Sequence, residues 1–391
     1  MRVLVLGAGM QGRAALYDLS CNPQVAHMIA ADANPQALAP FIKHLDQSRL
    51  EVVTLDAADA EEAGKLMDRV DAVVALLPPE FDVPMLRLAI QHGAHFVTTS
   101  YALPELVALA KEAEARGLTV LTEFGFDPGI DLVLTGQAVR DLDEVLELFS
   151  YGAGFPEPVA ANNPLKYKIS WTWRGVLKAY SRPVRLVRDG QIVDLPGREI
   201  FAPENIHTIE LPEWGTHEAY PNGNVVTFLE RLGLLGKVRN AARYSNRWPG
   251  HCAFWYKMAQ LGFLDTEPIQ VGDARVAPRD FLDALLEPQL QYKDDERDVA
   301  TLRIDVRGIK DGQGKRIVYE LCDVRDLETG LMAMNRTTGQ TAALGAQMIL
   351  RGDISKRGLA TPLADVPVDV FLQEMAARRI SITRRDEAWQ V

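Results

Sequence analysis

The sequence predicts an α/β protein in which a doubly wound parallel sheet carries an inserted α+β domain. Over residues 1–130, short apolar strands alternate with helical stretches, which is the pattern of a parallel sheet covered on both faces. Over residues 131–334 the pattern changes to alternating strands and hairpins, typical of a mixed or antiparallel sheet. The last segment, residues 335–391, begins Ala-rich and helical, so we expect it to pack back on the first domain.

The first strand and the glycine loop after it carry the strongest functional signal. Val3–Leu6 are apolar, glycines follow at positions 7, 9 and 12, and a helical stretch comes next. In this context the glycines allow a tight turn, a close approach of the backbone to a pyrophosphate and close helix packing. The second strand, residues 28–31, ends in Asp32, where a carboxylate can hold ribose hydroxyls. The sequence therefore predicts a Rossmann dinucleotide-binding domain, against the simpler alternative of a strand, turn and helix without a ligand.

Four further strands complete the predicted first domain, at residues 50–56, 71–77, 95–99 and 118–122. Helical spacing at 83–92 and 104–116 separates the last three of them. Ligands of such sheets bind beyond the carboxyl ends of the strands. We therefore expect the cofactor to contact Gly7, Ala8, Gly9, Met10, Gln11, Gly12, Asp32, Asp56, Leu77, Pro78 and Asp127.

Hairpin signals mark the second domain. Residues 184–195 predict a hairpin that turns at Asp189-Gly190. A second hairpin is predicted to pair residues 301–306 with residues 316–322. After it, residues 338–350 are helical, and Gly352 is expected to end that helix.

Composition and charge exclude several classes of function. With 42 basic and 53 acidic side chains, the net charge of -11 argues against nucleic acid as a partner. No apolar run is long enough to span a membrane, and a strand that starts at residue 2 leaves no room for a signal peptide. We therefore expect a cytoplasmic protein with no membrane contact. Three scattered cysteines and histidines without ligand spacing predict neither a disulfide framework nor a metal site.

Ser100 and Tyr101 follow the strand at residues 95–99 and are expected to face the ligand. Their hydroxyls suit contacts to the nicotinamide amide or to a substrate carboxylate. The alternative for Ser100 is that it only starts the turn before the helix at Pro104.

Asp127 and Pro128 are typical of a helix start, with Asp as the N-cap and Pro at the first helical position. That structural role would explain Asp127 by itself. The same carboxylate at a strand end also suits a substrate ammonium, and Asp131 would lie one helical turn later on the same face.

Several stretches resemble the glutamate-forming saccharopine dehydrogenases, in the same order along residues 1–360. They are residues 98–101, 125–131, 163–171 with 174–177, 218–222, Gly250 with Cys252, and 261–265. The resemblance implies a Rossmann domain, an inserted α+β domain for substrate binding and dimerisation, a homodimer, and no metal. It also implies hydride transfer between a nicotinamide and the C–N bond of saccharopine, the adduct of lysine with glutamate.

The predicted cofactor is NAD, with NADP as the less favoured alternative. Members of the family that use NADP carry an arginine-type residue near the end of the second strand, where this chain has Ala31-Asp32-Ala33-Asn34. A carboxylate at this place accepts a hydrogen bond from a 2′-hydroxyl and repels a 2′-phosphate.

Two departures from the family pattern concern the substrate. The family's Asn-Arg-Asp reads Asn222-Gly223-Asn224 here, which removes a charge-assisted contact worth about 1.5–3 kcal/mol. Its Arg-Gly-Thr reads Arg243-Tyr244-Ser245, so Arg243 stays a candidate carboxylate clamp. We expect the amino-acid substrate to contact Ser100, Tyr101, Asp127, Asn222, Arg243 and Ser245.

The reaction needs a base that accepts a proton from the substrate nitrogen. The catalytic candidates are Asp127, Tyr101 and Lys168, and the carboxylates of Glu123 and Asp131 are further candidate bases. The alternative for Lys168 is a place on the solvent-exposed face of a strand, without a catalytic role. Two other functions stay open: lysine 6-dehydrogenase, which residues 276–357 also resemble, and an inactive NAD-binding regulator, which Gly223 suggests.

Overall fold

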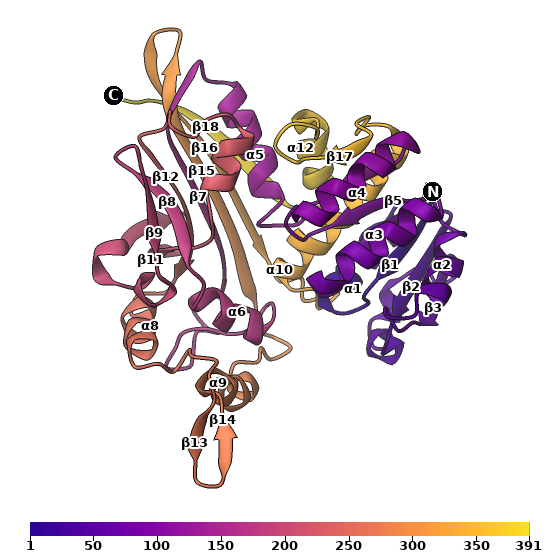
Figure 1. The fold of residues 1–391 in the computed structure, drawn as a ribbon, viewed down its shortest axis with the longest axis horizontal. Coiled ribbons are helices and arrows are strands. Elements are labelled where there is room, and N and C mark those ends of the chain that lie inside the picture. The colour runs from indigo at the N-terminus through magenta and orange to yellow at the C-terminus, as the bar shows by residue number, and fades with distance from the viewer. Residues whose placement is uncertain (391) are drawn as a thin grey trace. The chain divides into compact units, whose positions relative to one another are not determined.

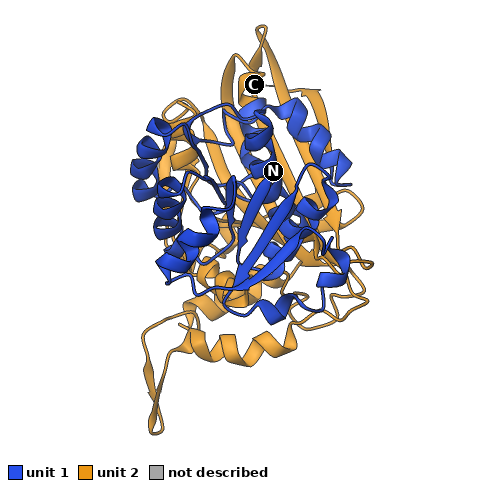
Figure 2. Cartoon of the chain, turned by 90° about the vertical axis from the view of Figure 1, so that its right-hand side faces the viewer, with its two compact units in different colours: residues 1–137, 335–381 blue, residues 138–334, 382–391 orange. Residues whose placement is uncertain are grey.

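The computed structural model describes residues 1–390, which divide into two compact units. Unit 1 contains residues 1–137 and 335–381, and unit 2 contains the described residues 138–334 and 382–390 (Figure 2). Each unit has its own sheet.

Unit 1 is built on a seven-stranded sheet with the strand order β17-β6-β5-β4-β1-β2-β3. All of its strand pairs are parallel, which confirms the predicted doubly wound sheet. The strands are β1 (Arg2–Leu6), β2 (His27–Asp32), β3 (Leu50–Thr54), β4 (Ala72–Ala75), β5 (His95–Thr98), β6 (Thr119–Leu121) and β17 (Gly358–Ala360). β17 was not predicted, because its three residues are too few to show a pattern.

Helices cover both faces of this sheet (Figure 1). On one face lie α2 (Ala60–Met67), α3 (Asp82–Gln91) and α4 (Pro104–Ala115), packed side by side. On the other face, α1 (Met10–Cys21) packs against α11 (Thr341–Arg351). α12 (Val368–Ala377) completes the unit, and Gly352 ends α11 in the left-handed conformation, as the sequence predicts. α11 starts later than expected because residues 336–340 form a π-helix.

Unit 2 is built on a nine-stranded mixed sheet with the path β10-β11-β12-β7-β15-β16-β18. Its strands are β7 (Glu144–Pro156), β8 (Val184–Arg188), β9 (Gln191–Leu195), β10 (His207–Leu211), β11 (Gly215–Pro221), β12 (Asn240–Arg247), β15 (Asp298–Lys310), β16 (Gln313–Val324) and β18 (Ser381–Ala388). The register confirms both predicted hairpins: Val184 pairs with Leu195, and Thr301 pairs with Cys322.

An aromatic core lies under the helices of unit 2. It is formed by α6 (Trp173–Tyr180), α8 (His251–Gln260) and α9 (Pro278–Leu286) together with the loop around Tyr167. α7 (Val226–Arg231) follows the turn after β11, and a separate small hairpin pairs β13 (Ile269–Val271) with β14 (Ala274–Val276). α5 (Ile130–Arg140) and α10 (Ala333–Asn335) each span a boundary between the units.

The end of the chain differs from the expectation that all of residues 335–391 pack on the first domain. β18 pairs instead with β16 at the edge of the unit 2 sheet. Charged side chains stabilise it there: Arg384 binds Asp141, and Lys315 Nζ lies 2.7 Å from Asp386 Oδ2.

Among residues 1–390, no helix combines the length and the apolar character needed to cross a membrane.

Candidate functional site

The glycine loop after β1 is held in a tight turn against α1. Gly7 has φ +91° and its N–H donates to Ala31 O at 2.8 Å. A Cβ atom at Gly12 would lie 1.9 Å from Gly7 O, so only glycine permits this approach. No side chain caps the N-terminus of α1 at Gly9. The backbone N–H groups of this first turn are therefore suited to a phosphate.

Asp32 stands at the carboxyl end of β2, where the sequence predicts it, but its carboxylate has backbone partners. Oδ2 accepts from Ala8 N at 2.7 Å, and Oδ1 accepts from Asn34 N at 2.7 Å. Asp32 therefore links the glycine loop to the turn after β2.

A pocket of about 260 Å³ opens beside Asp32. It brings together four of the predicted cofactor residues, Asp32, Asp56, Leu77 and Pro78, with an apolar wall of Leu6, Ala31, Leu55 and Phe81. A mainly apolar pocket next to an uncapped helix N-terminus fits the adenosine part of a dinucleotide. Direct contact of each residue with the cofactor stays a prediction.

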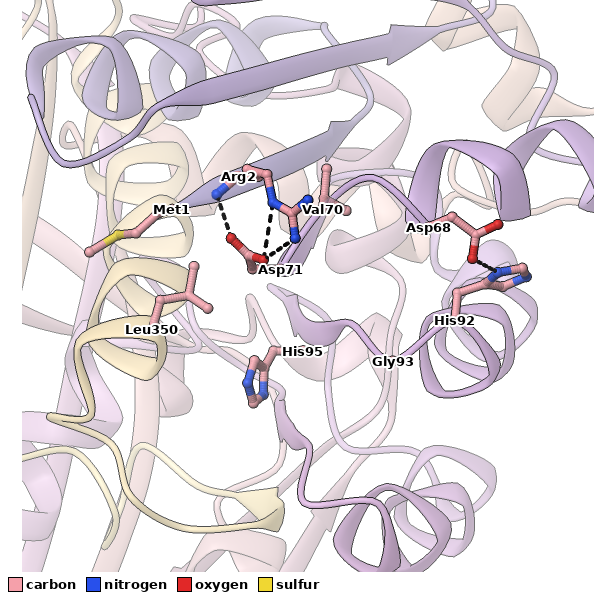
Figure 3. Close-up of a pocket in the computed structure, with 9 residues that line it drawn as sticks. All are labelled: Met1, Arg2, Asp68, Val70, Asp71, His92, Gly93, His95 and Leu350. Atoms are coloured by element: carbon pink, nitrogen blue, oxygen red, sulfur yellow. Dashed lines mark hydrogen bonds and ion pairs between the residues drawn. The ribbon is translucent and has the colours of Figure 1, made fainter.

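A second pocket, of about 510 Å³, lies at the amino ends of β1, β4 and β5 (Figure 3). Figure 3 shows its polar side chains paired with one another: Arg2 Nη2 lies 2.6 Å from Asp71 Oδ1, and His92 Nδ1 lies 2.7 Å from Asp68 Oδ1. Because ligands of parallel sheets bind at the carboxyl ends of the strands, this pocket is not the cofactor site.

The segment after β6 runs along the end of β5. Glu123 N donates to Ser100 O at 2.9 Å, and Phe124 N donates to Thr98 O at 3.1 Å. Glu123 is buried and has a positive φ of 58°. The structure thus brings the acidic stretch and the predicted Ser100-Tyr101 pair to the same strand end.

Asp127 is not the N-cap of a helix, contrary to one of the two roles predicted for it. Gly125 N donates to Pro128 O at 3.0 Å and Ile130 N donates to Gly125 O at 3.0 Å, so residues 125–129 form a closed loop before α5. The peptide bond between Asp127 and Pro128 is cis. Asp127 is half-buried, and its predicted role toward a substrate stays a prediction.

Asp131 holds this loop from within α5. Its Oδ1 accepts from Gly129 N at 2.7 Å, and the side chain is 1% exposed. Burial raises the pKa of Asp131 to about 7, and the nearby Glu123 adds to this shift, while backbone hydrogen bonds oppose it. The carboxyl group is therefore one that changes protonation near neutral pH.

The hydroxyl of Ser100 lies near a buried acid rather than in an isolated turn. Thr98 Oγ1 donates to Asp82 Oδ1 at 2.9 Å, and Ser100 N donates to Thr98 Oγ1 at 3.2 Å. Burial raises the pKa of Asp82, although hydrogen bonds from Ser100 and Thr98 lower it. Tyr101 is 39% exposed. Residues 99–100 form a bend before α4, and contact with a substrate stays a prediction for both Ser100 and Tyr101.

Lys168 lies in unit 2 in a buried ion pair. Its Nζ is 2.5 Å from Glu296 Oε2, and both side chains are at most 9% exposed. Burial would raise the pKa of Glu296, but hydrogen bonds from Lys168, Lys293 N and Asn162 outweigh it and lower the pKa. The expected solvated strand face is absent here. The ion pair with Glu296 gives Lys168 a structural partner, and its role as a base stays a prediction.

One face of β12 carries Arg243, Ser245 and Arg247, all buried. Ser245 Oγ donates to Gly152 O at 2.8 Å and accepts from Arg247 Nη1 at 3.0 Å. Asn222 N donates to Arg243 O at 2.8 Å. The structure therefore brings together the three substrate-contact residues predicted in the second domain.

Arg247 is a candidate functional residue that no motif in the sequence indicates. Its Nε donates to Tyr180 Oη at 3.3 Å, and its guanidinium carbon lies 5.1 Å from the centre of the Tyr167 ring and 5.7 Å from that of Tyr220. Within the described chain, no acidic oxygen lies within 4.0 Å of it. The sequence does contain a signal for this residue. Positions 243, 245 and 247 alternate along a strand, so their side chains lie on one face.

No three His, Cys, Asp or Glu side chains of residues 1–390 are grouped as a metal site would require.

The parallel sheet, the glycine loop at the end of β1 and the pocket beside Asp32 define a Rossmann-type protein that binds a pyridine dinucleotide. Residues 3–121 match the family model described as the saccharopine dehydrogenase NADP binding domain, and residues 125–380 match that of the saccharopine dehydrogenase C-terminal domain. The chain belongs to the saccharopine dehydrogenase family.

Relatives and a solved structure agree with this assignment. The chain is 28% identical to saccharopine dehydrogenase [NADP(+), L-glutamate-forming] of Saccharomyces cerevisiae, and the match covers 95% of this chain and 96% of that protein. It is 26% identical to the alpha-aminoadipic semialdehyde synthase of Arabidopsis thaliana over 81% of this chain, but spans only 37% of that longer protein. The fold matches apo L-Glu-forming saccharopine dehydrogenase from S. cerevisiae with a TM-score of 0.85, at 24% identity, over 99% of this chain and all of that one.

The preference for NAD over NADP was wrong. The family model that matches residues 3–121 is an NADP binding domain, and the yeast relative is named as NADP(+)-dependent. The prediction treated the Asp32 carboxylate as free to select the ribose, whereas two backbone N–H groups already bind it.

The structure also places a cation at the turn after β2. Arg13 of α1 donates from Nη2 to Ala37 O in the 3-10 turn Pro35–Leu38, and its buried Nε has no acceptor among the described residues. A guanidinium at this turn fits a 2′-phosphate. The residues near the end of β2 do not reveal this cation, because Arg13 belongs to α1.

Proposed function

We propose that this protein is an NADP-dependent oxidoreductase that oxidises the C–N bond of saccharopine and forms glutamate. The observation that carries the proposal is the family match, which runs through both the dinucleotide-binding domain and the C-terminal domain, over residues 3–380 with a gap of three residues at 122–124. The name of the yeast relative, which this chain matches over 95% of its length, supports the same substrate and cofactor.

Oxidation of the C–N bond requires several contributions from the side chains of this protein. The substrate nitrogen has to be neutral before the carbon beside it gives up a hydride, so a base must accept the ammonium proton. NADP+, when bound, supplies the hydride acceptor. Water then adds to the resulting iminium carbon, and cleavage of the C–N bond releases glutamate and an aldehyde from the lysine half.

Asp127 and Tyr101 are the proposed bases, and Ser100 is a proposed substrate contact. The half-buried Asp127 carboxylate follows β6, and Tyr101 follows β5, two neighbouring strands of the unit 1 sheet. Their position at carboxyl strand ends supports a role beside the cofactor. The backbone bond from Glu123 N to Ser100 O holds the two stretches together.

The direct test follows the absorbance of reduced cofactor with saccharopine or lysine, each supplied with NADP+ and with NAD+. We expect NADPH to form with saccharopine, together with one glutamate per NADPH. Reduced cofactor from lysine without glutamate would select lysine 6-dehydrogenase instead. Cofactor binding without turnover of either amine would favour the inactive regulator.

Substitution of the proposed base sharpens the test. Asp127→Asn should lower kcat by about a hundredfold to ten-thousandfold, as expected when a general base is lost. Glu105→Gln is the matched control, because Glu105 is an exposed carboxylate in the first turn of α4. Equal activity of both variants would exclude Asp127 as the base.

A further inference from the structure

Three segments of unit 2 meet around Gly223. Arg185 N donates to Gly223 O at 3.3 Å, and Val225 N donates to Arg185 O at 3.1 Å, so the turn after β11 is joined to the start of β8. Asn222 N donates to Arg243 O at 2.8 Å, which joins the same turn to β12. These backbone hydrogen bonds thus fix the position of Gly223 relative to Arg182 and Arg243.

Two guanidinium groups point toward the open side of this glycine. A Cβ atom built at Gly223 would lie 3.9 Å from Arg182 Nη2 and 3.9 Å from Arg243 Nη1. Arg182 comes from the turn between α6 and β8 and was not selected from the sequence. Its Nη2 donates to Asn222 Oδ1 at 3.1 Å, so the amide of Asn222 fixes where the guanidinium lies.

Arg182 has unused capacity to bind an anion. No carboxylate oxygen within the described part of the chain lies within 4.0 Å of its guanidinium, and its buried Nε has no hydrogen-bond acceptor there. By contrast, the neighbouring Arg185 is paired with Asp194 at 2.7 Å. A buried donor without an acceptor is costly, which points to a ligand that supplies one.

The environment of Arg243 adds a second cation at the same place. Arg243 is 6% exposed, and its guanidinium carbon lies 4.8 Å from the centre of the Phe228 ring. Together with Arg182, it places two planar guanidinium groups beside one glycine, each with several N–H donors. A carboxylate fits this arrangement because its two oxygens can accept from both planar groups.

We propose that Arg182 and Arg243 together bind one carboxylate of the substrate beside Gly223, with Asn222 positioning Arg182. The proposal rests on the proposed function, which gives a substrate with several carboxylates. In this arrangement Arg182 supplies the guanidinium group that is missing at position 223. The loss of affinity expected from the sequence therefore does not follow.

The test compares Arg182→Met and Arg182→Gln with the wild-type protein. Both variants should raise the KM for saccharopine by about tenfold to a hundredfold, as for loss of a charge-assisted hydrogen bond, with a smaller change in kcat. Glutamine keeps a donor for Asn222 Oδ1 but no charge, so a purely structural Arg182 would be rescued by it. Arg185→Met is the matched control, because Arg185 is exposed and already paired with Asp194.

The outcomes separate this inference from the proposed function. A KM within about twofold of wild type in Arg182→Gln, with an unchanged melting temperature, would overturn the inference and leave the function standing. If the wild-type protein does not oxidise saccharopine, the function fails, and calorimetric titration with glutarate still tests the site. Glutarate binding that is lost in Arg182→Gln and kept in Arg185→Met supports the site, whereas no binding to wild type or equal binding to all three overturns it.

Discussion

Buried charged side chains in this protein are compensated in three different ways. The Asp298 carboxylate accepts from Ala333 N at 2.7 Å and from Met334 N at 3.1 Å. Lys168 has Glu296 as a direct counter-charge. Arg247 has tyrosine rings and hydroxyls instead, and its charge lowers the pKa of Tyr167, which burial nevertheless raises to about 12. Only the first kind of compensation leaves a group that titrates near neutral pH.

Asp298 should make the stability of unit 2 depend on pH. Burial raises its pKa to about 7 from 3.8, so between about pH 4 and pH 7 the folded state keeps a proton that the unfolded state has already released. Stability from this group is present at low pH and is lost as the pH rises through 7, by at most about 1.4 kcal/mol per pH unit. We expect Asp298→Asn to flatten this dependence between pH 5 and pH 8.

Tryptophan fluorescence during urea unfolding is a suitable measurement, because all six tryptophans lie in unit 2. Asp273→Asn is the control, since Asp273 is exposed in the turn between β13 and β14. The same slope for wild type and Asp298→Asn would contradict the expected protonation.

Arg13 should contribute to affinity for NADP+ through its position at the turn after β2. Arg13→Met removes the cation but keeps a helix-compatible side chain. We expect the Kd for NADPH, measured by its own fluorescence, to rise about tenfold or more, and the Kd for NADH to change little. An equal loss of affinity for both nucleotides would show that Arg13 acts on the loop and not on the 2′-phosphate.

At the level of elements, the turn between β1 and α1 depends on two glycines for different reasons. Gly12 is needed for packing, since its Cβ would lie 1.9 Å from Gly7 O. Gly9 has open space around it and an ordinary φ of −67°. The space beside Gly9 is therefore available to a ligand rather than to the protein.

Gly12→Ala and Gly9→Ala should consequently behave differently. Gly12→Ala should destabilise unit 1 by about 1–3 kcal/mol, the usual cost of overpacking. Gly9→Ala should leave the melting temperature within about 1 °C and weaken cofactor binding, because the added methyl group occupies the approach to the pyrophosphate. Circular dichroism melts and NADPH titrations measure both effects, and a stable Gly12→Ala protein would contradict the packing argument.

Elements with a strong local pattern could be predicted from the sequence, and short or context-dependent ones could not. β1 and α1 were predicted because apolar residues and glycines lie next to one another in the chain. β17 has three residues and joins the unit 1 sheet only through pairing with β6. The closed loop at residues 125–129 replaced a predicted helix start, because hydrogen bonds from Gly125 and Ile130 outweigh the local preference of Asp-Pro.

For the whole molecule, the resemblance implies a homodimer, which stays a prediction. Exposed apolar side chains in unit 2 offer a physical reason for association: Ile269 and Val271 of β13 are each 56% exposed, and Phe281 of α9 is 51% exposed. We expect multi-angle light scattering to give twice the mass of one chain at micromolar concentration. A monomer mass that does not change on dilution or concentration would contradict the dimer.

The doubly wound sheet and the dinucleotide loop could be predicted from the sequence, because each depends on residues that are close together in the chain. The family could be predicted because its short motifs follow one another in order along residues 1–360. Tertiary structure decided which side chains are free to act. It showed that backbone N–H groups occupy Asp32 and that Glu296 holds Lys168. It also showed that Arg182 reaches the place that Gly223 leaves open. These are contacts between distant segments, and their energies depend on burial and distance, which residue types and spacing alone do not specify.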